Sequence, residues 1–283
     1  MKSVFITGAS TGIGEAIALR LAKANWKVFA GVRNDDDGAR LQDKNAGIVP
    51  IRLDVTKQDE IEAAAQQVSD ALDGHTLSGL VNNAGIAQMG PLTIQPMEEI
   101  RAHFEVNTLG AIAVCQAFAP LLGQDRSRRG RPGRIINITS MGGQIASPFL
   151  GAYTATKHAM ESVTDSLRRE LRMFGIDAIV VGPGAVKTPI WKKAQKEGGP
   201  PYQDTPWANA IASFLDTMVK SGENGLPVED IAEVVETALT DPRPRARYNP
   251  VPHKLTNFYL LKAMPKRCLD RGFATRFKLD RPA

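Results

Sequence analysis

Cysteine is nearly absent from the sequence: Cys115 and Cys268 are the only two in a chain of 283 residues. They form no CxxC pair, which excludes a disulfide framework and a cysteine-based zinc site and favours a reducing compartment. Histidine is also scarce, and the four histidines show no spacing typical of metal ligands. We therefore expect no metal site.

Long apolar runs are missing as well. The sequence has no stretch of about twenty uninterrupted apolar residues, the length that a membrane-spanning helix needs. Its first ten residues, MKSVFITGAS, hold only a short apolar run before Thr7, so we expect no signal peptide and a cytoplasmic protein. The net charge of +5 and the pI of about 9.2 are a modest bias without any nucleic-acid motif. We expect no nucleic-acid partner.

What the sequence does contain is an alternation of short apolar strands with amphipathic helices. Continuous apolar strands of this kind are typical of a parallel sheet buried on both faces. The pattern predicts an α/β fold, a Rossmann-type doubly wound parallel sheet, in a single domain over residues 1–283. We expect strands at residues 3–7, 27–32, 48–55, 77–85, 134–140 and 176–184, and helices that include residues 13–21, 60–72, 97–122 and 151–174.

The chain changes character after residue 189. A polar segment is followed by an apolar stripe at helical spacing between Trp207 and Val219, and then by a helix over residues 226–239. We expect residues from about 190 to 227 to form a substrate lid, and residues from about 243 to 283 to form a C-terminal extension. The alternative is that the stripe belongs to a helix simply docked on the core.

The segment TGASTGIG joins the first strand to the first helix. Its glycines, Gly8, Gly12 and Gly14, allow a tight turn and let a pyrophosphate approach the helix N-terminus, where free N–H groups favour an anion. A tight turn without a ligand is the alternative. The position between a strand and a helix favours a dinucleotide.

The end of the second strand bears on the choice of cofactor. Rossmann folds that bind NAD usually place an acid there to hold the ribose 2′-hydroxyl, whereas Arg33 stands there in this chain. An arginine is able to pair with a 2′-phosphate, so the sequence favours NADP(H) over NAD(H). The alternative is a solvated arginine, with the ribose reached by Asp35, Asp36 or Asp37.

Tyr153 and Lys157 lie four residues apart in YTATK and share one face of the predicted helix. A free tyrosine has a pKa near 10, and a neighbouring ammonium favours its phenolate. Such a tyrosine acts as general acid when a ketone is reduced and as general base when an alcohol is oxidised. An isolated pair of this kind is more often an ordinary surface pair, so the interpretation depends on its neighbours.

These segments together resemble the short-chain dehydrogenase/reductase superfamily. The resemblance extends from Val4 to about Thr188 and includes TGASTGIG, the LDV of Leu53–Val55, the NNAG of Asn82–Gly85, Asn107, Ser140 thirteen residues before Tyr153, and GPGAVKTP.

The resemblance implies a role for each matching residue. Ser140 would hold the substrate oxygen, Lys157 would also bind the nicotinamide ribose, and Asn107 would hold a water that links Lys157 to solvent. The implied catalytic residues are Asn107, Ser140, Tyr153 and Lys157. The implied cofactor-binding residues are Gly8, Ser10, Gly12, Ile13, Gly14, Arg33, Asp54, Val55, Asn83, Gly85, Tyr153, Lys157, Pro183, Val186 and Thr188.

The expected function is hydride transfer between NADP(H) and a ketone or secondary alcohol. The apolar stripe and a C-terminal tail that resembles the steroid and retinol dehydrogenase branch indicate a hydrophobic, steroid-, retinoid- or lipid-like small-molecule substrate. The alternative function is a dinucleotide-binding redox sensor or scaffold without turnover. Against it, the chain keeps all four implied catalytic residues.

The basic tail leaves its own position open. It could cover the substrate cleft, a subunit interface or a membrane surface; we favour the cleft and do not favour peripheral membrane contact. The resemblance also implies a homo-oligomer, dimer or tetramer, formed through the helices over residues 97–122 and 151–174. The sequence names neither the substrate nor the direction of the reaction.

Overall fold

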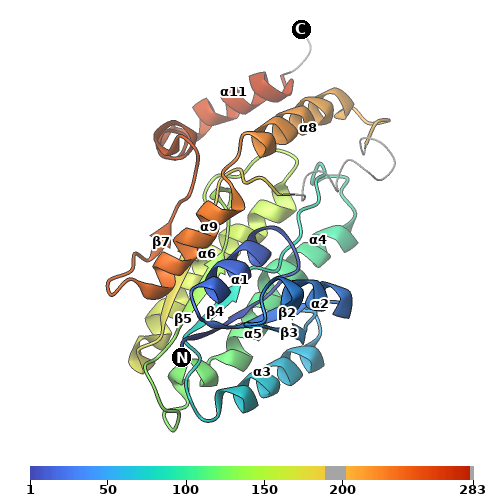
Figure 1. Ribbon diagram of the computed structural model, residues 1–283. Coiled ribbons are helices and arrows are strands. Elements are labelled where there is room, and N and C mark those ends of the chain that lie inside the picture. Colours follow the sequence, from blue (N-terminus) through green and yellow to red (C-terminus); the bar gives the residue numbers. More distant parts are fainter. Residues whose placement is uncertain (189–201, 281–283) are drawn as a thin grey trace.

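The computed structural model describes residues 1–188 and 202–280. Its centre is a seven-stranded parallel sheet in the order β3-β2-β1-β4-β5-β6-β7, in which the two halves meet between β1 and β4 (Figure 1). This is the predicted doubly wound Rossmann-type sheet. The strands are β1 (Ser3–Ile6), β2 (Lys27–Val32), β3 (Ile48–Arg52), β4 (Gly79–Asn82), β5 (Arg134–Ile138), β6 (Asp177–Val181) and β7 (Arg247–Tyr248).

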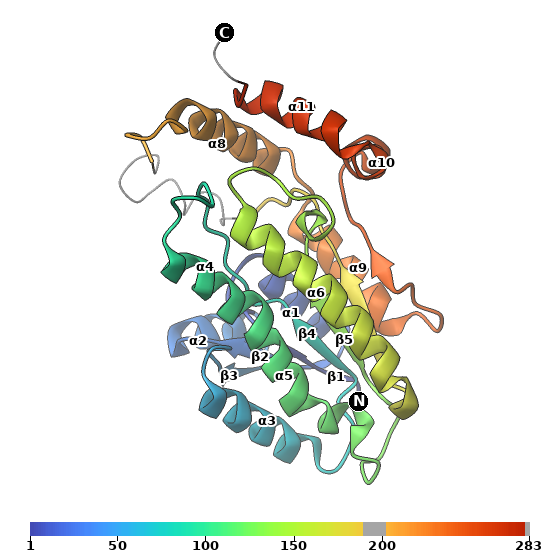
Figure 2. The same ribbon diagram turned by 180° about the vertical axis from the view of Figure 1, so that it is seen from behind.

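Helices cover both faces of the sheet, which explains why its strands are apolar throughout. Successive residues of a strand point to opposite faces. Val4 and Ile6 pack with the helices of one face, and Phe5 between them packs with those of the other. One face carries α1 (Gly12–Lys23), α2 (Asp35–Lys44) and α9 (Val228–Thr240), and the other carries α3 (Gln58–Leu72), α5 (Gly110–Phe118) and α6 (Gly151–Glu170) (Figures 1 and 2).

The long helix expected over residues 97–122 is present, but it is not a regular α-helix. It consists of α4 (Met97–Phe104), a π-helical turn over Glu105–Leu109, α5, and a second π-helical turn over Pro120–Gln124. A π turn holds one residue more than an α turn, so it shifts which side chains face the interior. Asn107 lies within the first of these turns and is buried.

Helix α2 and strand β7 are among the elements that were not expected from the sequence. Helix α2 begins after Asn34, whose side chain accepts a hydrogen bond from the backbone N–H of Asp37. Its first turn carries three acids, whose negative charges interact favourably with the helix dipole. Strand β7 pairs in parallel with β6 and extends the sheet with two residues of the C-terminal extension. Both elements lie next to the loops at the carboxyl edge of the sheet.

The C-terminal part of the chain lies over that edge. Helix α8 (Ala208–Glu223) and helix α11 (Lys266–Phe277) run side by side there (Figures 1 and 2). Phe214 of α8 contacts Phe277 of α11 and Phe149 in edge-to-face geometry, with ring centroids 5.3 and 5.6 Å apart. The predicted stripe is thus buried between the core and the extension, while the expected lid residues 190–201 lie outside the described residues.

Within the described ranges, no helix has both the length and the apolar character needed to cross a bilayer.

Candidate active site

The glycine-rich turn after β1 is shaped by close backbone contacts. Gly8 and Gly12 have φ values of +62° and +59°, which favour glycine. A Cβ on Gly8 would lie 2.8 Å from the Cα of Ala84, and one on Gly14 would collide with the Gly8 carbonyl oxygen. Asn83, the residue after β4, stabilises the turn by donating hydrogen bonds to the carbonyl oxygens of Thr7 and Gly8 at 3.1 and 2.9 Å. Contacts within the protein therefore fix the shape of the turn.

This turn fits a pyrophosphate. Thr11, the residue before α1, makes no side-chain hydrogen bond to the helix, so the first N–H groups of α1 have no side-chain cap. They face a cavity of about 1530 Å³ that runs along the carboxyl edge of the sheet. A helix N-terminus of this kind favours an anion.

Nearly all the predicted cofactor residues line this one cavity. Among the described residues, Gly14 is the exception, because its place is inside the turn. The predicted residues that do line it are Gly8, Ser10, Gly12, Ile13, Arg33, Asp54, Val55, Asn83, Gly85, Tyr153, Lys157, Pro183, Val186 and Thr188.

Arg33 and Asp54 lie at the end of the cavity where β2 and β3 finish. Arg33 is exposed and lines the cavity, whereas Asp35, Asp36 and Asp37 are not among the described lining residues. Desolvation by itself raises the pKa of Asp54, but hydrogen bonds from the amide and hydroxyl of Thr56 and the charge of Arg33 outweigh it, so the pKa lies below its usual value. The end of the cavity thus contains a cation and an ionised carboxylate.

Arg40 is a residue near this end that the sequence did not single out. Its guanidinium donates to the carbonyl oxygen of Ser10 in the glycine-rich turn and to Glu15 at 2.7 Å, and it lies 3.5 Å from Asp37. It therefore ties α2 to the turn. The acids before it indicate a helix start, but the contact with Ser10 depends on tertiary packing that no local signal reveals.

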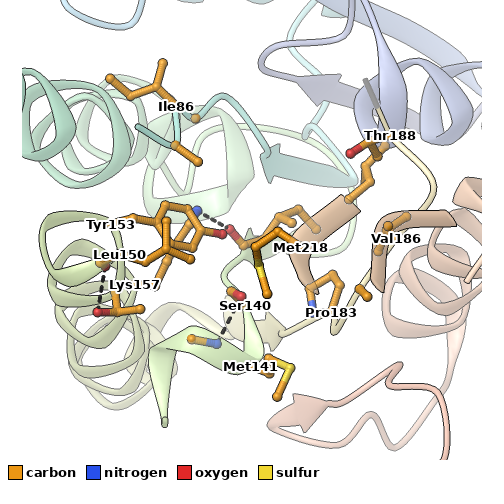
Figure 3. A pocket seen from close by; sticks show the side chains of 18 of the residues that line it. Ile86, Ser140, Met141, Leu150, Tyr153, Lys157, Pro183, Val186, Thr188 and Met218 are labelled. Atoms are coloured by element: carbon orange, nitrogen blue, oxygen red, sulfur yellow. Dashed lines mark hydrogen bonds between the residues drawn. The ribbon is translucent and has the colours of Figure 1, made fainter. Parts of the chain in front are cut away.

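Helix α6 brings Tyr153 and Lys157 to the same cavity as Ser140, which follows β5 (Figure 3). The Lys157 Nζ lies 5.7 Å from the centre of the Tyr153 ring and donates a hydrogen bond to the Ile138 carbonyl oxygen at 3.0 Å. The Ser140 Oγ accepts a hydrogen bond from the backbone N–H of Gly142 at 3.0 Å. Its hydroxyl also forms a hydrogen bond with Tyr153.

Burial shifts the pKa values of both members of this pair. Desolvation raises the pKa of Tyr153, opposed by a hydrogen bond with Ser140, and Lys157 is not among the causes. Desolvation lowers the pKa of Lys157 to about 8, and the charge of Glu161 opposes it. At neutral pH Lys157 still carries its charge, and the expectation that it favours the phenolate of Tyr153 stays a prediction.

Asn107 lies behind the cavity wall and is not one of its described lining residues. Its amide donates to the Ile86 carbonyl oxygen at 2.9 Å and to Thr156 Oγ1 at 3.1 Å, and its Oδ1 accepts from the Ile86 N–H at 2.8 Å. These bonds fix the loop after β4. The predicted bound water stays a prediction.

The other end of the cavity is lined by apolar side chains, among them Met218 of α8, Met141 and Leu150 (Figure 3), and also by the charged Asp216, Lys220 and Arg276. Phe273 and Phe277 of α11 also line it, so the extension covers the cleft, as favoured from the sequence. The sequence did not identify the individual aromatic residues of the tail, since α11 carries a polar face with many charges.

No group of three or more His, Cys, Asp or Glu side chains able to hold a metal occurs within residues 1–188 and 202–280. His103 is buried, and both of its ring nitrogens lie within hydrogen-bond distance of the backbone, at Gln88 N and Glu99 O.

The fold and this cavity are those of a dinucleotide-binding oxidoreductase. The family model described as short chain dehydrogenase matches residues 2–198, and the chain belongs to that family.

Individual relatives agree with this assignment. The chain is 36% identical over 274 residues to an NADPH-dependent 3-dehydrocapnine reductase of Ornithobacterium rhinotracheale, covering 96% of each chain. It is 32% identical over 263 residues to retinol dehydrogenase 5 of Mus musculus, covering 87% of this chain and 80% of the relative, which confirms the resemblance to the retinol dehydrogenase branch. A short chain dehydrogenase/reductase from Burkholderia phymatum in complex with NAD has the same fold, with a TM-score of 0.77 at 23% identity over 96% of this chain and 95% of that one.

Proposed function

We propose that this protein transfers a hydride between NADP(H) and an apolar ketone or secondary alcohol, with Tyr153 as general acid and base. The observation that carries the proposal is the position of Tyr153, Ser140 and Lys157 midway along one cavity. One end of that cavity is a glycine-rich turn suited to a pyrophosphate, and the lining of the other includes methionine and aromatic side chains. A carbonyl carbon placed between the two ends would lie beside the tyrosine.

The bound nicotinamide would supply the hydride. The chain's own residues handle the proton and the developing charge. The Tyr153 hydroxyl keeps its proton near neutral pH because burial raises its pKa, so it is able to donate that proton to the carbonyl oxygen. The Ser140 hydroxyl stabilises the same oxygen by a hydrogen bond.

Lys157 is suited to restore the proton. With a pKa of about 8, its ammonium exchanges a proton near neutral pH more readily than an exposed lysine does. Asn107 is predicted to hold a water that links this ammonium to solvent. In the oxidation direction, the positive charge of the nicotinamide would lower the pKa of Tyr153.

Arg33 favours NADP(H) over NAD(H). It lines the cavity where the adenosine ribose would lie, whereas the three acids that follow it form the first turn of α2 and are not among the described lining residues. The similarity to an NADPH-dependent reductase supports the same choice.

The same helices that frame the site support a homo-oligomer. Met97, Phe104 and Leu109 are 51%, 36% and 50% exposed along α4 and the π turn. Apolar side chains exposed along one helical face favour burial against a second copy. We propose that a dimer or a tetramer forms through this face. We also propose that the protein is cytoplasmic. Light scattering measures the mass of the assembly.

The function is tested by NADPH consumption with a panel of ketones and aldehydes, from small polar carbonyls to retinal and ketosteroids, and NADH in parallel. Wild type should reduce bulky apolar carbonyls with NADPH. Tyr153→Phe should lose at least about a hundredfold in kcat and still bind NADPH. Tyr259→Phe, which removes the same hydroxyl from an exposed side chain of the tail, is the matched control.

A reduction that proceeds equally well in Tyr153→Phe would contradict the tyrosine mechanism. Tight NADPH binding without turnover of any carbonyl would instead favour a redox sensor or scaffold.

A further inference from the structure

Arg247 links the C-terminal extension to the turn that carries Ser140. Arg247 lies in β7, and its guanidinium passes over Gly182, where even a Cβ would collide with it. It forms an ion pair with Glu161 and donates to the Ser140 carbonyl oxygen at 3.4 Å and, through Nε, to Asn249 at 2.6 Å. The two side chains of the ion pair are only 16% and 17% exposed.

Glu161 accepts hydrogen bonds from residues that precede and follow Ser140 in the chain. It lies one helical turn after Lys157 on α6 and accepts from Thr139 Oγ1 at 2.6 Å and from the Gln144 amide at 3.4 Å. Thr139 precedes Ser140, and Gln144 ends the short 3₁₀ turn that follows it. The Arg247–Glu161 pair therefore fixes the backbone on which the Ser140 hydroxyl is carried.

Strand β7 also holds the loop after β6, part of which lines the cavity. The backbone N–H groups of Gly182 and Gly184 donate to the carbonyl oxygens of Tyr248 and Pro250, both at 2.9 Å. Pro183 lies between these two glycines, and its carbonyl oxygen accepts a hydrogen bond from the Met141 N–H at 2.7 Å. The tail, this loop and the Ser140 turn form one hydrogen-bonded layer.

We propose that Arg247 is a positioning residue for the reaction: through Glu161 it holds the Ser140 turn against Tyr153. This inference rests on the proposed function for its kinetic part. Its structural part, the ordering of the turn by a residue about 110 positions away in the chain, is measurable without turnover. Arg247 itself touches neither the cavity nor, in this proposal, the substrate.

The first test is amide hydrogen exchange of the full-length protein without substrate. Arg247→Ala should lose protection in peptides that contain residues 139–145, while protection in β1 and β2 stays as in wild type. Arg245→Ala is the matched control, since it removes an exposed arginine two residues away. Unchanged exchange at residues 139–145 in Arg247→Ala would overturn the proposal whether or not a substrate is known.

The second test is kinetic. Arg247→Ala should lower kcat about 10- to 100-fold, the effect of a small displacement of a catalytic group, with the Kd for NADPH within about twofold of wild type. Arg247→Lys keeps the charge and should recover part of the loss. A kcat per folded molecule equal to that of wild type would show a merely structural contact and overturn the proposal.

A double-mutant cycle separates the two partners. If Arg247 acts through Glu161, then Arg247→Ala combined with Glu161→Gln should lower kcat no further than the more damaging single change. Losses that multiply would contradict it. Glu161→Gln also removes the carboxylate left unpaired in Arg247→Ala, so the pair of variants keeps the test open if that single variant folds poorly. Absence of turnover in wild type would instead contradict the proposed function, and the exchange test would still stand.

Discussion

Lys157 directs its ammonium to the carbonyl oxygen of Ile138, 3.0 Å away, while it lies 5.7 Å from the centre of the Tyr153 ring. The side chain is 6% exposed. A lysine buried in this way is held by the last residue of β5, which also leads to Ser140. The backbone that carries the serine therefore also orients the lysine.

Replacing this lysine should stabilise the protein while impairing it. Its pKa is lowered from 10.5 to about 8, so below pH 8 the folded state carries a buried ammonium that the unfolded chain leaves in water. Lys157→Met should raise the free energy of unfolding at pH 7 by about 2 kcal/mol after allowance for the lost hydrogen bond. The gain should shrink as pH rises from 8 to 10.5, because the unfolded lysine then loses its proton too.

Urea unfolding of both proteins at pH 7 and pH 10 measures this difference. A variant less stable than wild type at pH 7 would contradict the prediction. Turnover should fall sharply in the same variant.

Arg33 should discriminate between the two dinucleotides. Arg33→Ala removes a charge-assisted contact to a 2′-phosphate and should weaken NADPH binding about 10- to 100-fold, with little change for NADH. Arg52→Ala removes another exposed arginine from the end of β3, outside the described cavity lining, and serves as control. Fluorescence titration measures both Kd values, and equal weakening for both cofactors would show that Arg33 does not bind the phosphate.

Two glycines should respond in opposite ways to alanine. In Gly14→Ala the new Cβ would meet the Gly8 carbonyl oxygen and the Asn83 amide, so we expect a loss of about 2–4 kcal/mol in stability and weaker dinucleotide binding. Gly272 lies in α11 with nothing within 4 Å of such a Cβ, so Gly272→Ala should stabilise by up to about 1 kcal/mol. Thermal unfolding compares the two, and similar effects at both sites would contradict this account of the turn.

Phe277 should matter for large substrates. It ends α11 and packs on Phe214 of α8, where it is only 2% exposed. Phe277→Ala should therefore weaken the packing of α11 on α8 by about 3 kcal/mol. We expect KM to rise severalfold for bulky apolar carbonyls and to change little for small ones. Leu255→Ala, in the same extension but 77% exposed, should leave both KM values unchanged. An equal rise of KM for small and large substrates would argue against an apolar binding wall.

The sequence predicts the sheet and most of the cavity because its signals there are local. A glycine-rich turn after an apolar strand, or Tyr153 and Lys157 on one helical face, is fixed by nearest neighbours in the chain. The same signals do not reveal the π turn that carries Asn107. The extra residue of one π turn changes the spacing of apolar residues too little to be recognised in the sequence. Nor do they reveal the sign of the shift at Tyr153, which depends on burial by distant segments.

Strand β7 shows the other limit. Its two residues, Arg247 and Tyr248, carry no alternation of apolar and polar positions, and they become a strand only because β6 offers an unpaired edge. The contacts of Arg40 and Arg247 arise in the same way, from elements joined by packing. Local sequence identifies these arginines as charged residues and says nothing of their partners.

The late position of β7 in the chain has a consequence for biosynthesis. Six strands and the glycine-rich turn are complete by Val181, yet the edge strand that supports the loop after β6 comes from residues 247–248, followed by the helix that covers the cleft. These residues are synthesised after the six strands. A transcript truncated ahead of codon 247 would therefore encode the glycine-rich turn without the strand that supports the Ser140 turn.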